Sequence, residues 1–533
     1  MLAINSLSLI YLLPEYSRFL RALNCPENHQ KKILSNIITK NEDTEFGKKY
    51  NFRSIKSIKN FRKEVPLSDY EDYTKYIRKA MNGEQKVLTE EKINLLEPTG
   101  GSSSGSKLIP YTKGLEKEYK KGIYPWLANL YLNRPNLLNG KAYWAITPPG
   151  NIPEKDGSKI PIGFKEDTEY FGIIGRLLEK TMAVPSKLGK IDNIEEFLYL
   201  TALYLLREKN LTLISVWSPT FLLILIEKVK LFWDKILKEI EEGTDFPLIL
   251  TPSPSRVKEL KEAKDKNKID FSKIWEKLNL ISCWADGPSE MFITEIRENF
   301  PGVEIQGKGL LATEGIVSIP FTGFPGSVLA VRSHFYEFID LANGEILTLG
   351  NIKRGKHYSV VMTTSGGLYR YRLNDVVEAI GKIKNTPLIK FCGKQDLISD
   401  YFGEKLNEFF VRKTVKNALN KLKIRPEFLL FAPCDNKNFN YILYIKGKIK
   451  SEKIKGLEEI LENNLRKNFH YNYARNLGQL SKPKVVLINH IENPREIYMN
   501  FLINEGRKLG VIKPFIFYNK IGINDALTRG LNK

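Results

Sequence analysis

The chain has 533 residues, of which 42% are hydrophobic and 27% charged, as in an ordinary globular protein. That length predicts two or more domains, because single hydrophobic cores rarely grow so large. The four cysteines are widely spaced, with no pair at metal-ligand or redox spacing. They exclude a disulfide framework and indicate reduced thiols in a cytosolic protein.

The net charge of +21 raises the question of nucleic-acid binding. Lysines are interleaved with acidic residues, as in residues 258–266, and no helix-turn-helix, zinc-finger or RNA-recognition signature is present. We therefore expect a solvated lysine-rich surface and no specific nucleic-acid partner. The longest apolar run, Phe221 to Ile226, is far shorter than the ~20 residues of a membrane span, and residues 1–13 lack the features of a secretory signal. The sequence predicts a cytoplasmic protein without a membrane span.

Residues 1–90 are predicted to be mainly helical, with turns at Pro14, Pro26 and Pro66. Ser68 stands three residues before Glu71, a pattern that predicts a helix capped by the serine hydroxyl. This part of the chain carries no catalytic motif of its own.

The stretch from Glu97 to Pro110 is the first with a chemical signature. Glycines let a ligand approach the main chain closely, and successive N–H groups with hydroxyls form a concave anion site. A flexible linker is the alternative, but the apolar segment directly after Lys107 favours a phosphate loop closed by that lysine. It is not a Walker loop, because a serine stands where that motif needs lysine. The predicted phosphate-binding residues are Ser102, Ser103, Ser104, Gly105 and Ser106.

Helices and strands then alternate. The pattern predicts a helix from Lys113 to Leu132, a strand from Lys141 to Thr147 and a helix from Asp192 to Arg207. A buried strand from Leu211 to Val216 and a helix from Ser218 to about Ile240 follow.

Ligands of α/β proteins bind at such strand-to-helix junctions. This junction has two interpretations, to which we give equal weight. It is either part of a substrate pocket or a core tryptophan beside a helix cap. The residues concerned are Val216, Trp217, Ser218 and Thr220.

From Leu280 to about Lys390 short apolar strands predict a second sheet. After a polar turn at Gly393 to Asp396 the pattern changes to a small α+β unit. The fold class is therefore predicted to be α/β, with a large N-terminal domain of mixed sheets and helices (1–395) and a small C-terminal α+β domain (396–533). In the small domain we expect helices at 404–422 and 452–465 and strands at 428–432, 441–445 and 484–488.

Two further motifs carry polar chemistry. Thr313 and Glu314 place a hydroxyl beside a carboxylate, the oxygen ligands that Mg²⁺ takes, although a lone Thr-Glu pair is common. Residues 366–375 alternate aromatics and arginines as on a strand that ends at an exposed Asp375, a carboxylate suited to the hydroxyls of a ribose. The alternative for this motif is an ordinary strand ending in an Asn-Asp turn.

Taken together, these stretches resemble the auxin-responsive-promoter family of acyl acid amido synthetases, within the adenylate-forming superfamily. The resemblance covers nearly the whole chain, and the motifs look like those of a bacterial-type member. It runs, in this order, through residues 41–47, 64–72, the Ser/Gly loop, 284–287, 313–315, 367–372 and 402–406.

The resemblance implies an ATP- and Mg²⁺-dependent ligase that activates a small carboxylic acid as an acyl-adenylate and transfers it to an amine, usually of an amino acid. By motif match, Ser102 to Ser106 hold phosphates with Lys107, and Glu314 ligates Mg²⁺ beside Thr313. Asp375 binds the ribose, and residues 216–220 touch the acyl group. Lys513 resembles the terminal-domain lysine that reaches the active site, and Lys394 stands in the hinge motif.

Three residues depart from the family pattern. Leu310 replaces a frequent tyrosine at the adenine, Asn374 replaces a glycine, and Lys394 replaces an arginine whose planar fork would make a bidentate contact. An acyl-CoA ligase, which shares the first half-reaction, is the alternative function, and a basic nucleic-acid-binding protein is a remote one. The enzyme is expected to be a monomer.

Overall fold

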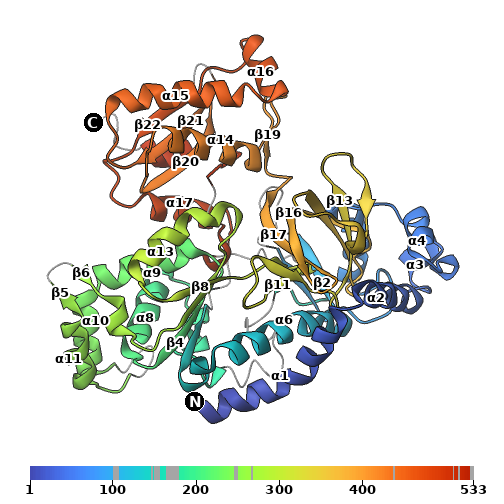
Figure 1. Ribbon diagram of the computed structural model, residues 1–533, viewed down its shortest axis with the longest axis horizontal. Helices are drawn as coiled ribbons and strands as arrows, with labels where there is room; N and C mark the ends of the chain where they lie inside the picture. The colour runs from blue at the N-terminus through green and yellow to red at the C-terminus, as the bar shows by residue number, and fades with distance from the viewer. Residues whose placement is uncertain are drawn as a thin grey trace.

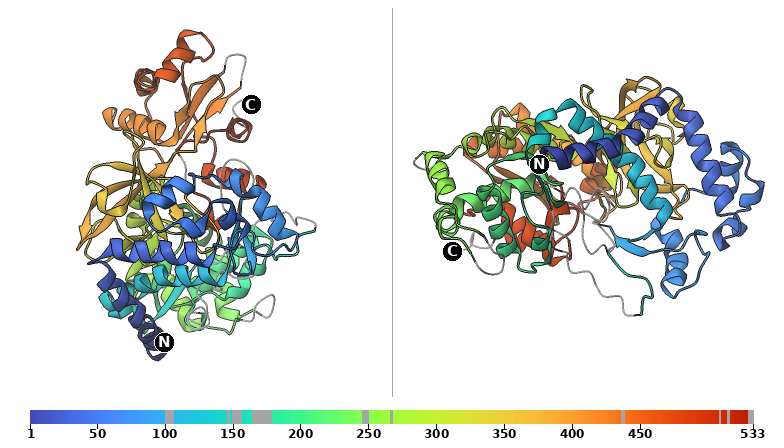
Figure 2. Two further views of the ribbon diagram at one scale, coloured as in Figure 1. Left: turned by 90° about the vertical axis from the view of Figure 1, so that its right-hand side faces the viewer. Right: turned by 90° about the horizontal axis from the view of Figure 1, so that it is seen from below.

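The protein is described from a computed structural model, which describes residues 1–99, 107–145, 148, 157–163, 179–244, 250–265, 268–435, 439–507, 509–513 and 516–528. Figure 1 shows a parallel-sheet part in green, an antiparallel-sheet part in yellow and orange, and a C-terminal unit in orange and red above both. The left view of Figure 2 shows the C-terminal unit at the end of the molecule opposite α1.

The N-terminal helices are α1 (Leu2–Ala22), α2 (Pro26–Lys40), α3 (Glu45–Lys49), α4 (Ile58–Glu64) and α5 (Tyr70–Met81). The predicted turn at Pro14 is wrong, because α1 continues through this residue. Pro14 lies on the exposed side of α1, where water can bond the carbonyl that loses its partner, while Leu12 and Phe19 anchor the buried side.

The predicted cap at Ser68 is also wrong. Helix α5 begins one residue later, with a capping box between Asp69 and Asp72. The Ser68 hydroxyl instead donates to the carbonyl of Tyr369 at 2.8 Å, so it joins α5 to the distant chain before β16.

Four parallel strands form the first sheet, in the order β3 (Lys141–Trp144), β4 (Leu211–Ser215), β7 (Leu280–Cys283) and β8 (Glu304–Gly307). Strands β7 and β8 were expected in the second sheet, but they pair with β4 and with each other. The helices of this part are α8 (Ile194–Arg207), α9 (Pro219–Leu231), α10 (Trp233–Glu242), α11 (Pro254–Glu262), α12 (Phe271–Ile274) and α13 (Ile293–Asn299), with a short hairpin of β5 (Lys264–Asp265) and β6 (Lys268–Ile269).

The single helix predicted from Ser218 to Ile240 is two helices. The chain leaves helical geometry at Phe232, and α10 then buries Trp233, Ile236 and Ile240 against the same core. Similarly, α8 is preceded by Asn193 as its cap rather than Asp192, because the Asn193 side chain accepts the N–H of Glu196.

The second sheet is antiparallel, in the order β11 (Ser318–Pro320), β12 (Ser327–Leu329), β17 (Thr386–Lys394), β16 (Tyr371–Ile383), β15 (His357–Thr363), β13 (Phe335–Asp340) and β14 (Ile346–Leu347). Beside it lie helix α6 (Lys113–Asn133) and two hairpins, β1 (Leu95–Pro98) with β2 (Leu108–Tyr111) and β9 (Leu311–Ala312) with β10 (Gly315–Ile316). Helix α6 packs against α1 on one side and against β10 and β11 on the other, so it fixes the β9–β10 hairpin relative to the antiparallel sheet.

The C-terminal unit has a sheet of β20 (Phe428–Cys434), β21 (Asn440–Lys446) and β22 (Lys484–Leu487), with helices α14 (Glu408–Lys421), α15 (Ser451–Leu465) and α16 (Phe469–Asn476). These elements share a core around Val411, Leu443 and Leu461. A small hairpin, β18 (Ile398–Ser399) with β19 (Leu406–Asn407), leads into the unit.

The last elements, α17 (Pro494–Asn504) and α18 (Ile523–Thr528), share a second core with the opposite face of β20 and β21, and α18 contacts β20. Met499, Leu502 and Ile512 share this core with Leu430 and Tyr444 and with the helices of the parallel sheet, so this end of the chain joins the C-terminal unit to the N-terminal part. The domain boundary between residues 395 and 396 stays a prediction.

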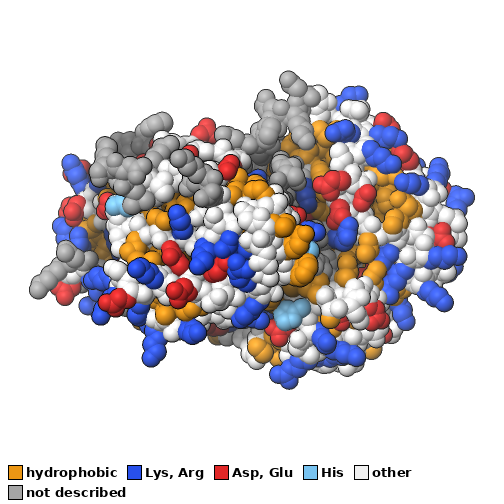
Figure 3. Space-filling view, turned by 90° about the horizontal axis from the view of Figure 1, so that it is seen from above, with side chains coloured by type: hydrophobic (Ala, Val, Ile, Leu, Met, Phe, Trp, Pro, Cys, Tyr) orange, Lys and Arg blue, Asp and Glu red, His pale blue; other side chains and the backbone are white. Residues whose placement is uncertain are grey.

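The surface carries both charges. Figure 3 shows Lys and Arg side chains interspersed with Asp and Glu over the visible face. Within the described residues, no helix combines the length and the apolar character that a membrane crossing requires.

Candidate active site

A cleft lies where the parallel sheet, the antiparallel sheet and the C-terminal unit meet. Its volume, including the open mouth, is about 630 Å³. One wall follows the ends of β7 and β8, a second is the end of β17, and a third comes from the C-terminal unit. The lining residues are Trp284, Ala285, Asp286, Pro288, Ser289, Lys308, Gly309, Leu310, Leu311, Phe391, Gly393, Lys394, Leu397, Glu408 and Lys513.

Opposite charges gather at one side of this cleft. Asp375 on β16 stands directly opposite Lys394 on β17, and the Lys394 ammonium lies 3.4 Å from the Asp375 carboxylate. Glu314, Asp396 and Lys513 are close enough to influence the pKa of neighbouring members of the group. We call these five residues the charge cluster.

Asp375 was predicted to be exposed at the end of a strand, and this is wrong. Strand β16 continues to Ile383 between β15 and β17, and Asp375 is only 2% exposed. Its Oδ1, the oxygen that faces the Lys394 ammonium at 3.4 Å, has no further polar partner among the described residues. Asn374 before it has φ +59°, a conformation that asparagine tolerates better than most residues, which accounts for Asn in the place of the family's glycine.

The turn between β9 and β10 carries Thr313 and Glu314. The carbonyl of Thr313 accepts hydrogen bonds from the hydroxyls of Tyr111 and Tyr119, at 2.7 and 2.6 Å. Burial raises the pKa of Glu314, against the opposing effect of Lys394. Tyr111 and Tyr119 therefore fix the backbone of the turn that carries Glu314, a member of the charge cluster.

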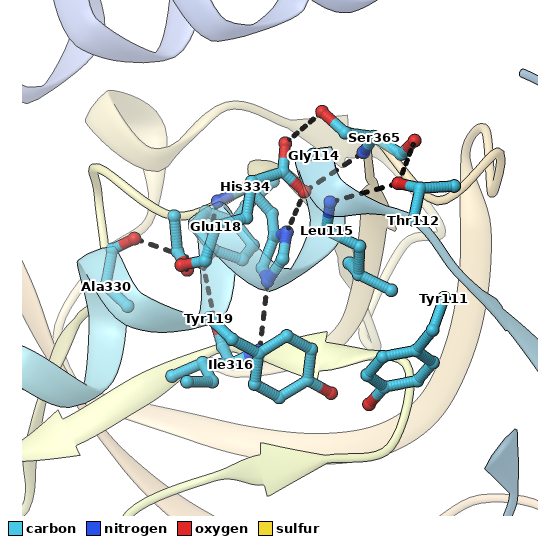
Figure 4. Close-up of polar contacts among 12 residues, drawn as sticks. Tyr111, Thr112, Gly114, Leu115, Glu118, Tyr119, Ile316, Ala330, His334 and Ser365 are labelled. Carbon is cyan, nitrogen blue, oxygen red and sulfur yellow. Dashed lines mark hydrogen bonds and ion pairs between the residues drawn. The ribbon is translucent and has the colours of Figure 1, made fainter. Parts of the chain in front are cut away.

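A buried polar network supports the same hairpin (Figure 4). The carboxylate of Glu118 accepts from His334 Nδ1 at 2.9 Å and from the Ser365 hydroxyl at 2.6 Å, while His334 Nε2 accepts the N–H of Ile316 on β10 at 3.1 Å. These are the residue types of a hydrolase triad, but the serine bonds the carboxylate rather than the histidine. The network joins α6, β10 and the β15–β16 connection, and its role is to position them.

The two lysines of the charge cluster differ. Burial opposes the charged form of Lys394, but Asp375, Asp396 and Glu314 raise its pKa overall. Burial, followed by the nearby Lys394, lowers the pKa of Lys513. Lys513 Nζ lies 5.6 Å from the ring centre of Trp284 and 5.8 Å from that of Phe391, so the C-terminal unit delivers this lysine into the cleft.

The predicted phosphate loop falls largely outside the described residues, including Ser102, Ser103, Ser104, Gly105 and Ser106. Its two ends are described: the N–H of Thr99 donates to the carbonyl of Lys107 at 2.8 Å, and strand β2 follows. A strand rather than a helix after the loop agrees with the exclusion of a Walker motif. Lys107 Nζ lies 5.8 Å from the ring centre of Tyr70, and Lys107 also affects the pKa of Glu314.

The residues after β4 separate into two groups. Val216, Ser218 and Thr220 are buried, and the hydroxyls of Ser218 and Thr220 bond each other at 2.7 Å. Trp217 is half-buried, with its ring centre 6.1 Å from that of Trp284 in the cleft wall. The structure thus brings Trp217 to the cleft and leaves the other three in the packed junction of β4 and α9.

Sequence reasoning missed several residues of the cleft, chiefly Lys308, Phe391 and Glu408. Glu408 is fully buried, and burial raises the pKa of its carboxyl against the effect of Arg412. None of these residues belongs to a recognisable motif. The only signal was Lys308 between two glycines, next to the Thr-Glu motif.

Comparison with protein families decides the relationship. Residues 15–305 match the model of the GH3 family N-terminal domain, and residues 327–394 match that of the GH3 family central domain. This chain belongs to the GH3 family. The resemblance drawn from its motifs is therefore confirmed, while the bacterial character of those motifs stays a prediction.

Individual relatives of this GH3 protein are distant. It is 22% identical over 467 residues to the indole-3-acetic acid-amido synthetase GH3.2 of Arabidopsis thaliana, covering 79% of this chain and 82% of the relative. It is 23% identical over 496 residues to the putative indole-3-acetic acid-amido synthetase GH3.9 of the same plant, covering 81% and 83%.

Among solved structures, AtGH3.15 acyl acid amido synthetase in complex with 2,4-DB superposes with a TM-score of 0.83 at 20% identity, over 97% of this chain and 96% of that one. This likeness confirms the predicted fold class.

Proposed function

We propose that this GH3 protein is an ATP-dependent acyl acid amido synthetase, a ligase that joins a carboxylic acid to an amine, typically of an amino acid. The observation that carries the proposal is that Lys394 and Lys513 line one cleft, with Glu314 and Asp375 close enough to shift the pKa of Lys513, in a chain of this family. The names of the relatives, for indole-3-acetic acid and for an acyl acid amido synthetase, support an acyl acid as substrate.

In the first half-reaction a carboxylate oxygen of the acid attacks the α-phosphorus of ATP, and the bond to pyrophosphate breaks. In the second, the nitrogen of the amine attacks the acyl carbon, the bond to AMP breaks, and the amine loses a proton. Both steps depend on positioning and on neutralising charge. The lysines Lys107, Lys394 and Lys513 supply positive charge around the cleft, and Ser102 to Ser106 supply donors to the phosphates.

The donor set at the β9–β10 turn suits Mg²⁺, since a carboxylate and a hydroxyl are both oxygen ligands. Glu314, with Thr313 beside it, would hold the ion, which when bound neutralises phosphate charge. The buried carboxylate of Asp375, whose Oδ1 faces the Lys394 ammonium at 3.4 Å, would accept a ribose hydroxyl. Trp217 would contact the acyl group, with Val216, Ser218 and Thr220 supporting it.

The same proposal extends to the organisation of the enzyme. Residues 1–395 would bind ATP and the acid, and residues 396–533 would move between the two half-reactions, acting as a monomer in the cytoplasm. The turn from Gly393 to Asp396 would serve as the hinge.

The test is ATP–pyrophosphate exchange with a panel of carboxylic acids, followed by product analysis with amino acids or coenzyme A. Exchange with an acid and amide formation with an amino acid would support the proposal. Thioester formation instead would assign the acyl-CoA ligase alternative, and absence of exchange with every acid would overturn both.

A further inference from the structure

One lysine in the cleft takes no part in the charge cluster. Lys308 follows β8 and is 3% exposed, and its ammonium donates to the hydroxyl of Ser215 at 2.6 Å. Among the described residues no carboxylate lies within ion-pair distance of it. Lys228, another buried lysine, is 4% exposed and pairs with Glu195 and Glu496 at 3.0 Å each. Lys308 is therefore a buried lysine that has no carboxylate partner among the described residues.

Three tryptophans surround this ammonium. Lys308 Nζ lies 5.1 Å from the ring centre of Trp126, 5.9 Å from that of Trp144 and 5.0 Å from that of Trp217. They come from α6, β3 and the chain after β4. Aromatic faces attract a cation, but they carry no net charge and leave it unneutralised.

The pairing of the sheet explains why these groups meet. Trp144, Ser215, Ser282 and Gln306 are neighbours in register across the four parallel strands, so their side chains project from the same face. The hydroxyl of Ser282 is buried and has no hydrogen-bond partner among the described residues. We call Trp126, Trp144, Ser215, Trp217, Ser282 and Lys308 the tryptophan–lysine floor.

The floor is electrostatically separate from the reaction centre. The pKa of Lys308 is lowered to about 7 by burial, with the Cys283 thiol of β7 as the only opposing group. Neither Glu314 nor Asp375 is among the groups that shift the pKa of Lys308. An anion on Lys308 would therefore lie away from the carboxylate that reacts with ATP.

We propose that Lys308 binds a second anionic group on the acyl substrate, so that the acids this enzyme activates are dicarboxylic acids. The activation of the acid rests on the proposed function. The choice of dicarboxylic acids as substrates rests on the tryptophan–lysine floor alone. The reacting carboxylate faces the charge cluster, the second carboxylate accepts from Lys308, which lines the cleft, and the body of the acid lies against the half-buried ring of Trp217.

The test uses pairs of acids in which an isopropyl group of similar shape replaces one carboxylate: glutarate with isoheptanoate, and terephthalate with para-isopropylbenzoate. Binding to the full-length enzyme is measured by calorimetry, and activation by pyrophosphate exchange. We expect the dicarboxylate to be preferred ~10- to 100-fold in at least one pair, the range for a hydrogen bond to a charged group. Lys308→Met should abolish the preference for the dicarboxylate. Lys228→Met, which removes another buried lysine, should lower the stability of the protein but leave that preference unchanged.

A measurement on the unmodified enzyme guards against a misfolded variant. At pH 8 Lys308 is mainly neutral when no anion is bound, so binding of a dicarboxylate should take up protons, and binding of the apolar partner should not. Equal affinities within both pairs, a preference that survives Lys308→Met, or dicarboxylate binding without proton uptake would overturn the inference. Exchange with apolar acids alone would overturn it and leave the proposed function intact. Dicarboxylate binding without exchange would leave the inference about Lys308 intact and overturn the proposed function.

Discussion

The charge cluster and the tryptophan–lysine floor hold buried lysines in opposite electrostatic states. In the cluster, Asp375, Asp396 and Glu314 raise the pKa of Lys394 despite its burial. In the floor, burial lowers the pKa of Lys308 to about 7, because its neighbours are aromatic rings and a serine. A buried charge is costly unless it is paired. The carboxylates of the protein therefore keep Lys394 charged, whereas Lys308 would gain a full charge only with the anion that we propose.

The largest expected effect lies in the charge cluster. Glu314→Gln should keep the fold and reduce pyrophosphate exchange by ~100- to 1000-fold, since losing one preorganised charge-stabilising group costs about this much. Exchange rates with saturating acid, beside a circular-dichroism spectrum, check the prediction. Asp286→Asn, in the cleft wall, is the matched control, and a larger loss there would move the metal ligand to Asp286.

The floor makes a prediction about stability. Because the folded pKa of Lys308 is about 7 and the unfolded value is 10.5, the unfolded chain binds the extra proton between those pH values. The contribution of Lys308 to the free energy of unfolding should therefore rise with pH in that window, by up to ~1.4 kcal/mol per pH unit.

Urea unfolding of the wild type and Lys308→Met at several pH values between 7 and 10 measures the difference. If the difference in the free energy of unfolding between the two proteins does not change with pH, Lys308 is paired and charged in the folded protein. That result would remove the contrast between the two sites.

Asp375→Ala should weaken ATP binding by ~1.5–3 kcal/mol, the range for hydrogen bonds that involve a charged group. It also leaves Lys394 without its nearest partner at 3.4 Å. Calorimetric titration with ATP gives the affinity, and Asp375→Asn, which keeps an acceptor of the same shape, should lose less. Unchanged affinity in a folded Ala variant would argue against a ribose contact.

The smallest effect concerns closure of the C-terminal unit. Lys416 on α14 pairs with Glu290 of the N-terminal part at 2.8 Å, with both side chains partly exposed. Lys416→Glu should change one half-reaction more than the other by ~2- to 5-fold, as expected for a surface pair worth ~0.2–1 kcal/mol. Glu290→Lys in the same chain should restore the wild-type ratio of the two half-reaction rates. Equal changes in pyrophosphate exchange and amide formation would count against movement of the C-terminal unit.

Local patterns in the sequence predicted much of this architecture. The helix beginning at Lys113, the strand after Leu211 and the alternation within the C-terminal unit all appear near their expected places. These elements depend on periodicity and caps, which neighbouring residues determine. The motif order was likewise sufficient to predict the family, because each motif is contiguous.

Only the tertiary structure decided what depends on distant partners. Periodicity does not specify which strand pairs with which, so it could not place β7 and β8 beside β4, or bury Asp375 between two strands. Nor could it bring Trp126, Trp144 and Trp217 around Lys308, four residues spread over nearly half the domain predicted to bind ATP. A side chain's pKa depends on what surrounds it in space, and that surrounding forms only when the sheet assembles.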